Sequence, residues 1–213
     1  MQWFWFFFFY SLGGYGLEKA YAFITRPRHR VRKCFLLLPL CPVYGLAMVA
    51  VLRLAGDTES FWQLALYGGI LCTAVEYAVH FLYEKCLGVL FWDYSGTHLD
   101  LNRRICFPFS VAWGVLSALA VRYVQPKLAP VAAAIAPEVT LAALLLLTAD
   151  SFFAVRLLRR SHNIDLLGLK NLWRGAAPGL IRRGRLHFLN RVRHSATANR
   201  GCHRTPYSAW PFR

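Results

Sequence analysis

Four carboxylic acids lie within long apolar segments of the sequence, at Glu18, Glu76, Glu138 and Asp150. A charged side chain at membrane depth is costly, so it usually faces the interior of a helix bundle or a water-filled cavity. Glu18, Glu76 and Asp150 each lie six to eight residues before a polar segment that we assign to the same membrane surface. A helix rises about 1.5 Å per residue, which puts the three carboxylates at a similar depth, roughly 9–12 Å from that surface. We therefore predict that they share a polar pocket, and that Glu138 lies near the opposite surface.

The apolar segment that contains Glu76 also carries His80 and Glu84, so three polar side chains recur at every fourth position. Side chains with this spacing lie along one face of a helix. Such a face suits substrate or cation binding, a proton relay, or a purely structural polar network, and the sequence leaves these open. A metal site is not predicted, because one helix supplies too few ligands and no second ligand cluster accompanies it. Arg104 and its neighbour Arg103 are candidate counter-charges, and the alternative is that they only anchor the chain at the membrane interface.

A second group of polar and aromatic residues lies in the connecting segment at residues 91–106. Trp92 and Tyr94 suit the lipid headgroup region. Asp93 and Ser95 offer local hydrogen bonds that tighten a turn. Aromatic anchoring alone does not require the aspartate, so we predict that this segment folds as a cap over the pocket.

Five long apolar segments must position these side chains. Each has about 20 or more mostly apolar residues, enough for a helix to cross about 30 Å of hydrocarbon. Backbone amides need partners in lipid, which favours helices, and no alternating pattern typical of barrel strands is present. A soluble domain with 57% hydrophobic residues would expose much apolar surface. We therefore predict an all-α, polytopic transmembrane helical bundle with five spans, at residues 3–24, 34–55, 61–83, 105–124 and 131–155.

Glycines and prolines punctuate several of these spans. Small residues let helices approach one another closely, and proline frees backbone groups that neighbours must satisfy. Ordinary packing within a bundle is the simpler interpretation, and a broken helix that lines a substrate cavity is the alternative. The residues concerned are Gly13, Gly14, Gly16, Pro39, Pro42, Gly45, Gly68 and Gly69.

Basic residues collect at alternate connections between the spans. Near the membrane, eleven Lys and Arg flank one surface and three flank the other. Cytoplasmic loops carry the excess of basic residues in membrane proteins, so we predict the N-terminus outside and the C-terminus inside the cell. The eleven are Arg26, Arg28, Arg30, Arg32, Lys33, Lys85, Arg103, Arg104, Arg156, Arg159 and Arg160; the three are Arg53, Arg122 and Lys127.

Residues 157–213 differ in character from the predicted transmembrane domain, residues 1–156. From Arg156 onward the chain holds 13 Lys and Arg against a single acid. Residues 163–173 and 179–192 alternate apolar side chains with arginine, as basic amphipathic helices do at an anionic membrane surface. We predict a cytosolic tail, amphipathic and partly disordered, that binds anionic lipid headgroups. Nucleic-acid binding is not expected, because inner-face tails are routinely basic.

Several short motifs follow one another in a specific order. They are Tyr10-Ser11-Leu12-Gly13-Gly14 with Glu18, Pro39-Leu40-Cys41-Pro42-Val43-Tyr44-Gly45, Glu76-Tyr77, Glu84-Lys85, Trp92-Asp93-Tyr94-Ser95, Arg104-Ile105-Cys106 with Ser110 and Gly114, and Asp150-Ser151. This order resembles a family of bacterial membrane proteins, the ABC-transporter type IV or CmpB-like permeases, over approximately residues 4–156. The chain departs from the family pattern at Leu38 and Arg103, where the family usually has glycine.

The resemblance implies a permease component of an ABC transporter in the bacterial cytoplasmic membrane. It also implies a separate ATPase subunit and a second copy of the bundle, as in a homo-oligomer. The sequence has no G-x-x-x-x-G-K-[ST] phosphate-binding loop, so ATP would be bound by the separate subunit. No catalytic residue, metal or cofactor is predicted.

Two other functions remain open at this point. One is a membrane-embedded enzyme or lipid-handling protein, with Glu76 or Asp93 as a general base and Arg104 holding an anionic headgroup. The other is a non-catalytic accessory protein, in which the polar groups serve helix association. The candidate pocket residues are Glu18, Tyr44, Glu76, Tyr77, His80, Glu84, Trp92, Asp93, Tyr94, Ser95, Asn102, Arg104 and Asp150.

Overall fold

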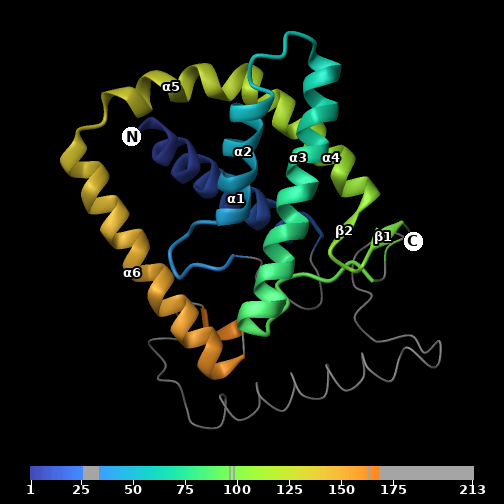
Figure 1. Ribbon diagram of the computed structural model, residues 1–213, viewed down its shortest axis with the longest axis vertical. Helices are drawn as coiled ribbons and strands as arrows, with labels where there is room; N and C mark the ends of the chain where they lie inside the picture. The colour runs from blue at the N-terminus through green and yellow to red at the C-terminus, as the bar shows by residue number, and fades with distance from the viewer. Residues whose placement is uncertain (26–33, 96, 98, 163, 168–213) are drawn as a thin grey trace.

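The chain folds into a bundle of helices with one small β-hairpin, as seen in a computed structural model (Figure 1). The structure describes residues 1–25, 34–95, 97, 99–162 and 164–167. Its helices are α1 (Gln2–Thr25), α2 (Pro42–Leu54), α3 (Phe61–Leu82), α4 (Phe107–Leu119), α5 (Gln125–Ala134) and α6 (Pro137–Ser161). Strands β1 (Asp100–Leu101) and β2 (Ile105–Cys106) pair antiparallel, with Leu101 opposite Ile105. The predicted helical bundle is thus confirmed, and the hairpin is an addition to the all-α prediction.

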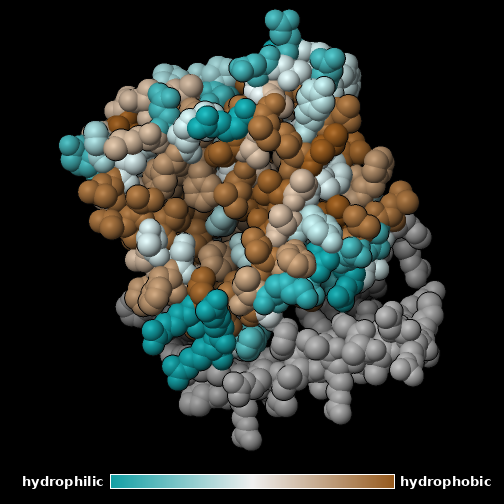
Figure 2. Space-filling model, in the orientation of Figure 1, coloured by the Kyte–Doolittle hydropathy of each residue, from teal (hydrophilic) through white to brown (hydrophobic). Residues whose placement is uncertain are grey.

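Three helical stretches in the described part of the chain are long and apolar enough to cross a membrane: Phe61–Leu87, Phe107–Ala134 and Pro137–Ser161. α1 is long enough, with 24 residues, but its tryptophans, tyrosines and glycines are less apolar than leucine or valine. α2 has 13 residues and spans about 20 Å, less than the hydrocarbon thickness. Figure 2 shows hydrophobic side chains across the middle of one face and hydrophilic ones gathered toward its two ends.

The predicted helix over residues 34–55 is wrong in its first part. Residues 34–41 are not helical, and α2 begins only at Pro42. A residue that precedes proline avoids the helical conformation, and Cys41 is accordingly extended, with φ of −116° and ψ of 90°. Pro42 lacks an N–H and is well suited to the first turn of a helix. The two prolines at 39 and 42 therefore set the start of α2.

The predicted break at residues 125–127 is also wrong. The chain stays helical from Phe107 to Ala134, passing through a π-helical turn, Ala120–Val124, between α4 and α5. Pro126 lies just after the π-helical turn, and its missing N–H removes a hydrogen bond from the regular helical pattern at this point. In Figure 1 the path bends between α4 and α5, so that α5 lies across the end of the bundle. The next helix, α6, begins at Pro137.

Two hydrogen bonds define the two ends of the bundle. Arg122 of the π-helical turn donates to the Thr58 carbonyl oxygen, between α2 and α3, at 3.2 Å. His162, which follows α6, bonds to the Leu87 carbonyl oxygen at 3.1 Å. α3 and α6 therefore finish at the same end, as Figure 1 also shows. A cluster of buried residues, including Phe91 and Leu158, fills the space between them at that end.

Glycine allows two pairs of helices to pack backbone against backbone. A Cβ atom built on Gly114 of α4 would collide with the Ala65 carbonyl oxygen of α3. A Cβ atom on Gly45 of α2 would collide with the Phe7 carbonyl oxygen of α1. The predicted close approach through small residues is thus confirmed for α3 with α4 and for α1 with α2. Gly16, in contrast, has no such neighbour within 4 Å.

Replacing Gly114 by alanine should destabilise the protein by about 1–3 kcal/mol, because the Ala65 carbonyl oxygen cannot move without shifting α3. Gly16→Ala is the matched control and should cost nothing, since alanine favours helix more than glycine does. Thermal unfolding of the two purified variants in detergent, followed by tryptophan fluorescence, measures the difference. Equal unfolding temperatures would mean that α3 and α4 are not in the close contact described.

The predicted tail lies almost entirely outside the described residues. α6 continues to Ser161, five residues past the predicted end of the transmembrane domain at residue 156, and Ile164–Leu167 forms a 3-10 turn. The other residues of the predicted amphipathic segments, 163–173 and 179–192, are not described. The basic connection at residues 26–33 also lies outside the described part.

Candidate functional site

The segment between α3 and α4 folds back along α3. α3 continues through a π-helical turn, Tyr83–Leu87, and ends at Gly88, whose φ of 64° is the left-handed conformation that glycine readily adopts after a helix. All three polar side chains spaced along α3 bond to this α3–α4 loop, residues 88–106. Glu76 Oε1 accepts from the Tyr94 hydroxyl (2.9 Å), His80 Nε2 bonds to the Trp92 carbonyl oxygen (3.0 Å), and Glu84 Oε2 accepts from Arg104 (2.6 Å). The polar face of α3 is therefore the contact face for the loop.

The aromatic side chains of the loop are buried inside the bundle. Phe91, Trp92 and Tyr94 are 0%, 5% and 1% exposed. Trp92 Nε1 donates to the Arg104 carbonyl oxygen at 2.9 Å, which closes the loop on itself. Tyr94 stacks on Phe109 of α4, with ring centroids 5.4 Å apart. Trp92 and Tyr94 suit lipid headgroups by residue type, but here they are enclosed by the bundle and their polar tips find partners within the protein.

A tight turn at residues 101–104 joins β1 to β2. The Arg104 N–H donates to the Leu101 carbonyl oxygen at 3.1 Å. Asn102 and Arg103 have φ of 52° and 64°, as the two central residues of a type I′ turn require. Asparagine tolerates this left-handed conformation, whereas the Cβ atom of arginine crowds the following carbonyl oxygen. Arg103 therefore carries backbone strain in this turn, which a glycine at the same position would relieve.

Arg103→Gly should therefore raise the free energy of unfolding by about 1 kcal/mol. The corresponding rise in the unfolding temperature is about 2–4 °C for a chain of this size. Asn102→Gly is the contrasting variant and should give no such gain, because asparagine is already tolerated there and its Nδ2 donates to the Tyr77 hydroxyl at 3.1 Å. Thermal unfolding of both variants tests this prediction. An unfolding temperature for Arg103→Gly below that of the unaltered protein would show that Arg103 is not strained in this turn.

The guanidinium of Arg104 ties the loop to α3. Its Nη2 lies 2.6 Å from Glu84 Oε2, and its Nη1 donates to the Tyr77 hydroxyl at 3.1 Å. The Arg104 and Glu84 side chains are 14% and 33% exposed, so the ion pair lies at the edge of the bundle. Arg104 is thus the counter-charge of Glu84. The lipid-headgroup hypothesis assigned this guanidinium to a substrate, whereas here both Nη atoms bind side chains of the protein.

Glu76 is the most deeply enclosed carboxylate of the site. It is 8% exposed and accepts hydrogen bonds at both oxygens, from Tyr94 at Oε1 and from Trp113 Nε1 at Oε2 (3.0 Å). Burial raises the pKa of Tyr94 well above its usual value, and the charge of Glu76 raises that pKa further. Tyr94 therefore stays protonated and remains a hydrogen-bond donor to the carboxylate. The two ring donors fix the orientation of Glu76.

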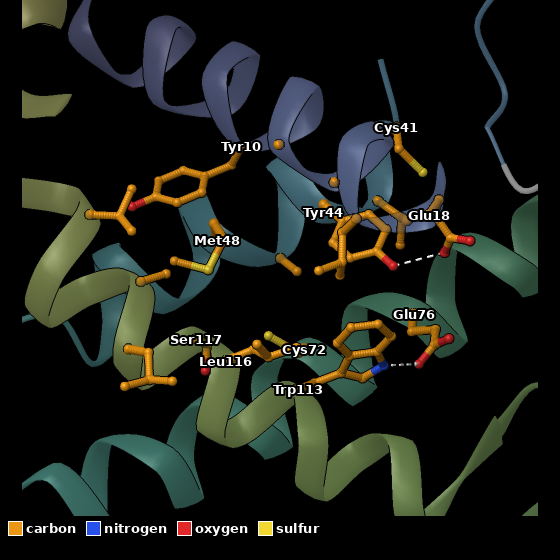
Figure 3. Close-up of a pocket in the computed structure, with 18 of the residues that line it drawn as sticks. Tyr10, Glu18, Cys41, Tyr44, Met48, Cys72, Glu76, Trp113, Leu116 and Ser117 are labelled. Atoms are coloured by element: carbon orange, nitrogen blue, oxygen red, sulfur yellow. Dashed lines mark hydrogen bonds between the residues drawn. The ribbon is translucent and has the colours of Figure 1, made fainter. Parts of the chain in front are cut away.

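A cavity of about 440 Å³ lies between α1 and α2 on one side and α3 and α4 on the other (Figure 3). At one end are Glu18 and Glu76, with the rings of Tyr44 and Trp113 beside them. The Tyr44 hydroxyl donates to Glu18 Oε1 at 2.8 Å. Away from this end the lining is mostly apolar and includes Ala47, Met48, Leu116, Leu119, Ala120 and Val124.

Comparison with known proteins shows the family to which this chain belongs. A family model described as "Putative ABC-transporter type IV" matches residues 5–155. The chain belongs to this family. The match covers nearly the same residues as the resemblance drawn from the motifs, which is thereby confirmed. Neither the curated proteins nor the solved structures contain a match to the chain. Membership of the ABC-transporter type IV family, together with the three long apolar helices, identifies a membrane protein.

In this ABC-transporter type IV protein, the predicted site residues fall into separate groups. Five of them line the cavity: Glu18, Tyr44, Glu76, Trp92 and Tyr94. Five others bind one another or the loop beside α3: Tyr77, His80, Glu84, Asn102 and Arg104. Asp93 and Ser95 form the predicted turn, in which the Ser95 N–H donates to Asp93 Oδ1 at 2.9 Å. Most of the residues singled out from the sequence thus lie near one another in the structure, but only part of the set faces the cavity.

Asp150 lies apart from the cavity. It is 8% exposed, and its Oδ2 accepts from the Leu38 N–H at 3.2 Å. Leu38 belongs to the non-helical segment before α2, where backbone groups lack helical partners. Nearby, the Cys41 N–H donates to the Ser11 carbonyl oxygen at 2.9 Å. Asp150 therefore provides a hydrogen-bond acceptor for a backbone N–H group that has no helical partner. Backbone polar groups of a chain in lipid need such partners within the protein.

Trp113 is a site residue that the sequence reasoning missed. Its indole donates to Glu76, and its ring meets that of Tyr44 edge to face, with centroids 5.4 Å apart. A tryptophan in the middle of an apolar span was the available signal, because a buried indole N–H usually finds an acceptor. In the part of the chain that the structure describes, no group of three or more His, Cys, Asp or Glu residues is placed to hold a metal ion.

Proposed function

We propose that this protein is the permease component of an ABC transporter and that the cavity between α1–α2 and α3–α4 receives the transported molecule. The observation that carries the proposal is the cavity itself. Its volume of about 440 Å³ lies in the range of small-molecule sites. Ionisable side chains at membrane depth mark substrate or ion pathways, and Glu18 and Glu76 are both in its wall. The family description supports a transport role.

The proposal includes five membrane crossings, with α1 and residues 34–55 completing the three long apolar helices. In the second crossing, the extended residues 34–41 add length to the short α2. Irregular backbone is tolerated at membrane depth where protein covers it, and Leu36, Leu40 and Cys41 are fully buried. Cys41 and Tyr44 also line the cavity, which favours the interpretation of a broken helix at a substrate site.

We propose the bacterial cytoplasmic membrane as the location, with the N-terminus outside and the C-terminus in the cytosol. The end of the bundle that contains Leu87 and His162 carries the larger number of basic residues and would face the cytosol. Thr58 lies at the opposite end. A reporter fused after Thr58 should behave as external, and cytosolic behaviour would overturn this orientation.

A separate ATPase subunit would dock on the cytosolic end, beside a second copy of the bundle, and the basic tail would bind anionic headgroups there. The test is a photo-crosslinking amino acid placed at Lys85 in the full chain. Lys85 is exposed beside Leu87, and Lys127, exposed on α5, is the matched position at the other end. Crosslinking to a protein that carries a phosphate-binding loop is expected from position 85 and not from position 127. Crosslinking to such a protein from neither position would contradict the permease role.

A lipid-handling role is the second candidate, and the mostly apolar lining of the cavity favours it. Both oxygens of Glu76 already accept hydrogen bonds from ring donors, so this carboxylate is better placed to bind than to abstract a proton. Turnover of a lipid by the purified protein, lost in Glu76→Gln with the fold retained, would favour this candidate over the permease.

A further inference from the structure

We infer that the cavity binds an amphipathic organic cation, a molecule with one positively charged head and a hydrophobic body. The inference rests on the proposed function, because it names the class of molecule that the same cavity would receive. It excludes organic anions and favours a cation over a neutral molecule of the same shape.

The charge of the cavity wall is the first observation. Among the described residues that line it, the charged side chains are Glu18 and Glu76, and none is Lys, Arg or His. The nearby base Arg104 is 2.6 Å from Glu84 and is not part of the lining. Charges attract more strongly in a low-dielectric site than in water, so the wall selects for positive charge.

The position of the aromatic rings is the second observation. Tyr44 and Trp113 stand beside the two carboxylates, with their planes at 89° to one another (Figure 3). Tyr94, which donates to Glu76, also lines this end of the cavity. Faces of Trp and Tyr attract cations, and aromatic walls of this kind recognise quaternary ammonium groups. Carboxylates and rings therefore act on the same head group.

The shape and the remaining lining are the third observation. The cavity is far larger than a metal ion requires, and most of its wall beyond the carboxylates is apolar. Met48 and Leu116 lie along it, away from the acidic end (Figure 3). A flexible methionine adapts to hydrophobic groups of different shape. The acidic end thus holds the head, and the apolar part of the cavity holds the hydrophobic body.

The experiment compares butyltriphenylphosphonium with butyltriphenylborate, two ions of the same shape and opposite charge that each have the charged centre at one end of a hydrophobic chain. Binding to the full chain in nanodiscs of zwitterionic lipid is measured by calorimetry, with empty nanodiscs as the blank. We expect the phosphonium to bind at least about tenfold more tightly than the borate. Equal affinities, or tighter binding of the borate, would overturn the inference without the need for any variant.

Variants then locate the binding site. Glu18→Gln should weaken phosphonium binding by about tenfold, because the charge is lost while an oxygen remains to accept from Tyr44. Glu138→Gln, an exposed acid at the start of α6 and outside the lining, is the matched control and should bind as the unaltered protein does. Retention of full affinity by a folded Glu18→Gln protein would also overturn the inference.

The outcome is separable from that of the proposed function. Phosphonium binding is measured on this chain alone, whereas the permease role is tested by crosslinking to an ATPase. Cation binding without crosslinking would support the proposed binding site and contradict the permease role. Crosslinking without a preference for the cation would support the permease role and overturn the inference that the cavity binds an organic cation.

Discussion

Glu76→Ala is expected to lower the free energy of unfolding by about 2–5 kcal/mol. The carboxylate accepts from the Tyr94 hydroxyl, which is buried, and from the Trp113 indole, which is half-buried in the cavity wall. Without it, the Tyr94 hydroxyl would lose its partner in a place that offers little water, and the Trp113 indole would lose its partner too, at a cost of about 1–3 kcal/mol per buried group. The measurement is thermal unfolding of the purified protein in detergent.

Two further variants serve as comparisons for the stability of Glu76→Ala. Glu138→Ala removes an exposed acid and should change stability by no more than about 0.5 kcal/mol. Glu76→Gln should fall between the two, because its amide oxygen can accept from one donor while its NH2 group opposes the other. If Glu76→Ala were as stable as Glu138→Ala, the two ring donors would not depend on this carboxylate.

Trp92→Ala should destabilise the protein by about 3–5 kcal/mol, the usual cost of removing a large core aromatic. Trp92 is 5% exposed, forms part of the cavity wall, and holds the loop through its bond to the Arg104 carbonyl oxygen. Without the side-chain bond to Arg104 the loop should loosen, although the backbone carbonyl oxygen at position 92 can still bond to His80. Hydrogen exchange of residues 91–106 should therefore rise together with the fall in unfolding temperature.

The matched control for that variant is Trp62→Ala. Trp62 lies at the start of α3 and is 76% exposed, so it contributes little to the packed core. Its loss should change stability by about 0.5 kcal/mol or less. Similar destabilisation by the two substitutions would mean that the α3–α4 loop is not packed against α3 as described.

The sequence leads to a prediction of depth for the polar residues, but it holds no information on the direction in which they face. Segment lengths and a fixed rise per residue place Glu18, Glu76 and Asp150 at similar levels. The rotation of each helix about its axis depends on packing that no segment length contains. Asp150 consequently points to the backbone before α2, whereas Glu18 and Glu76 line the cavity.

Local chemistry explains which other features could be foreseen. The i, i+4 spacing of α3 predicted a common polar face, and the Asp93–Ser95 turn followed from the residue types. The partners of that face could not be predicted, because they come from a loop whose path depends on tertiary contacts. The late start of α2 was readable from its two prolines, although overall hydrophobicity concealed it.

The glycine contacts divide the cavity wall into two halves. Two close contacts lock α1 to α2 and α3 to α4: Gly45 of α2 lies against the Phe7 carbonyl oxygen of α1, and Gly114 of α4 lies against the Ala65 carbonyl oxygen of α3. The cavity is bounded by one locked pair on each side. Glu18 lies on α1 of one pair and Glu76 on α3 of the other, so a change in the separation of the two pairs would change the distance between the two carboxylates. A head group held by both carboxylates would draw the halves together, and its departure would let them part.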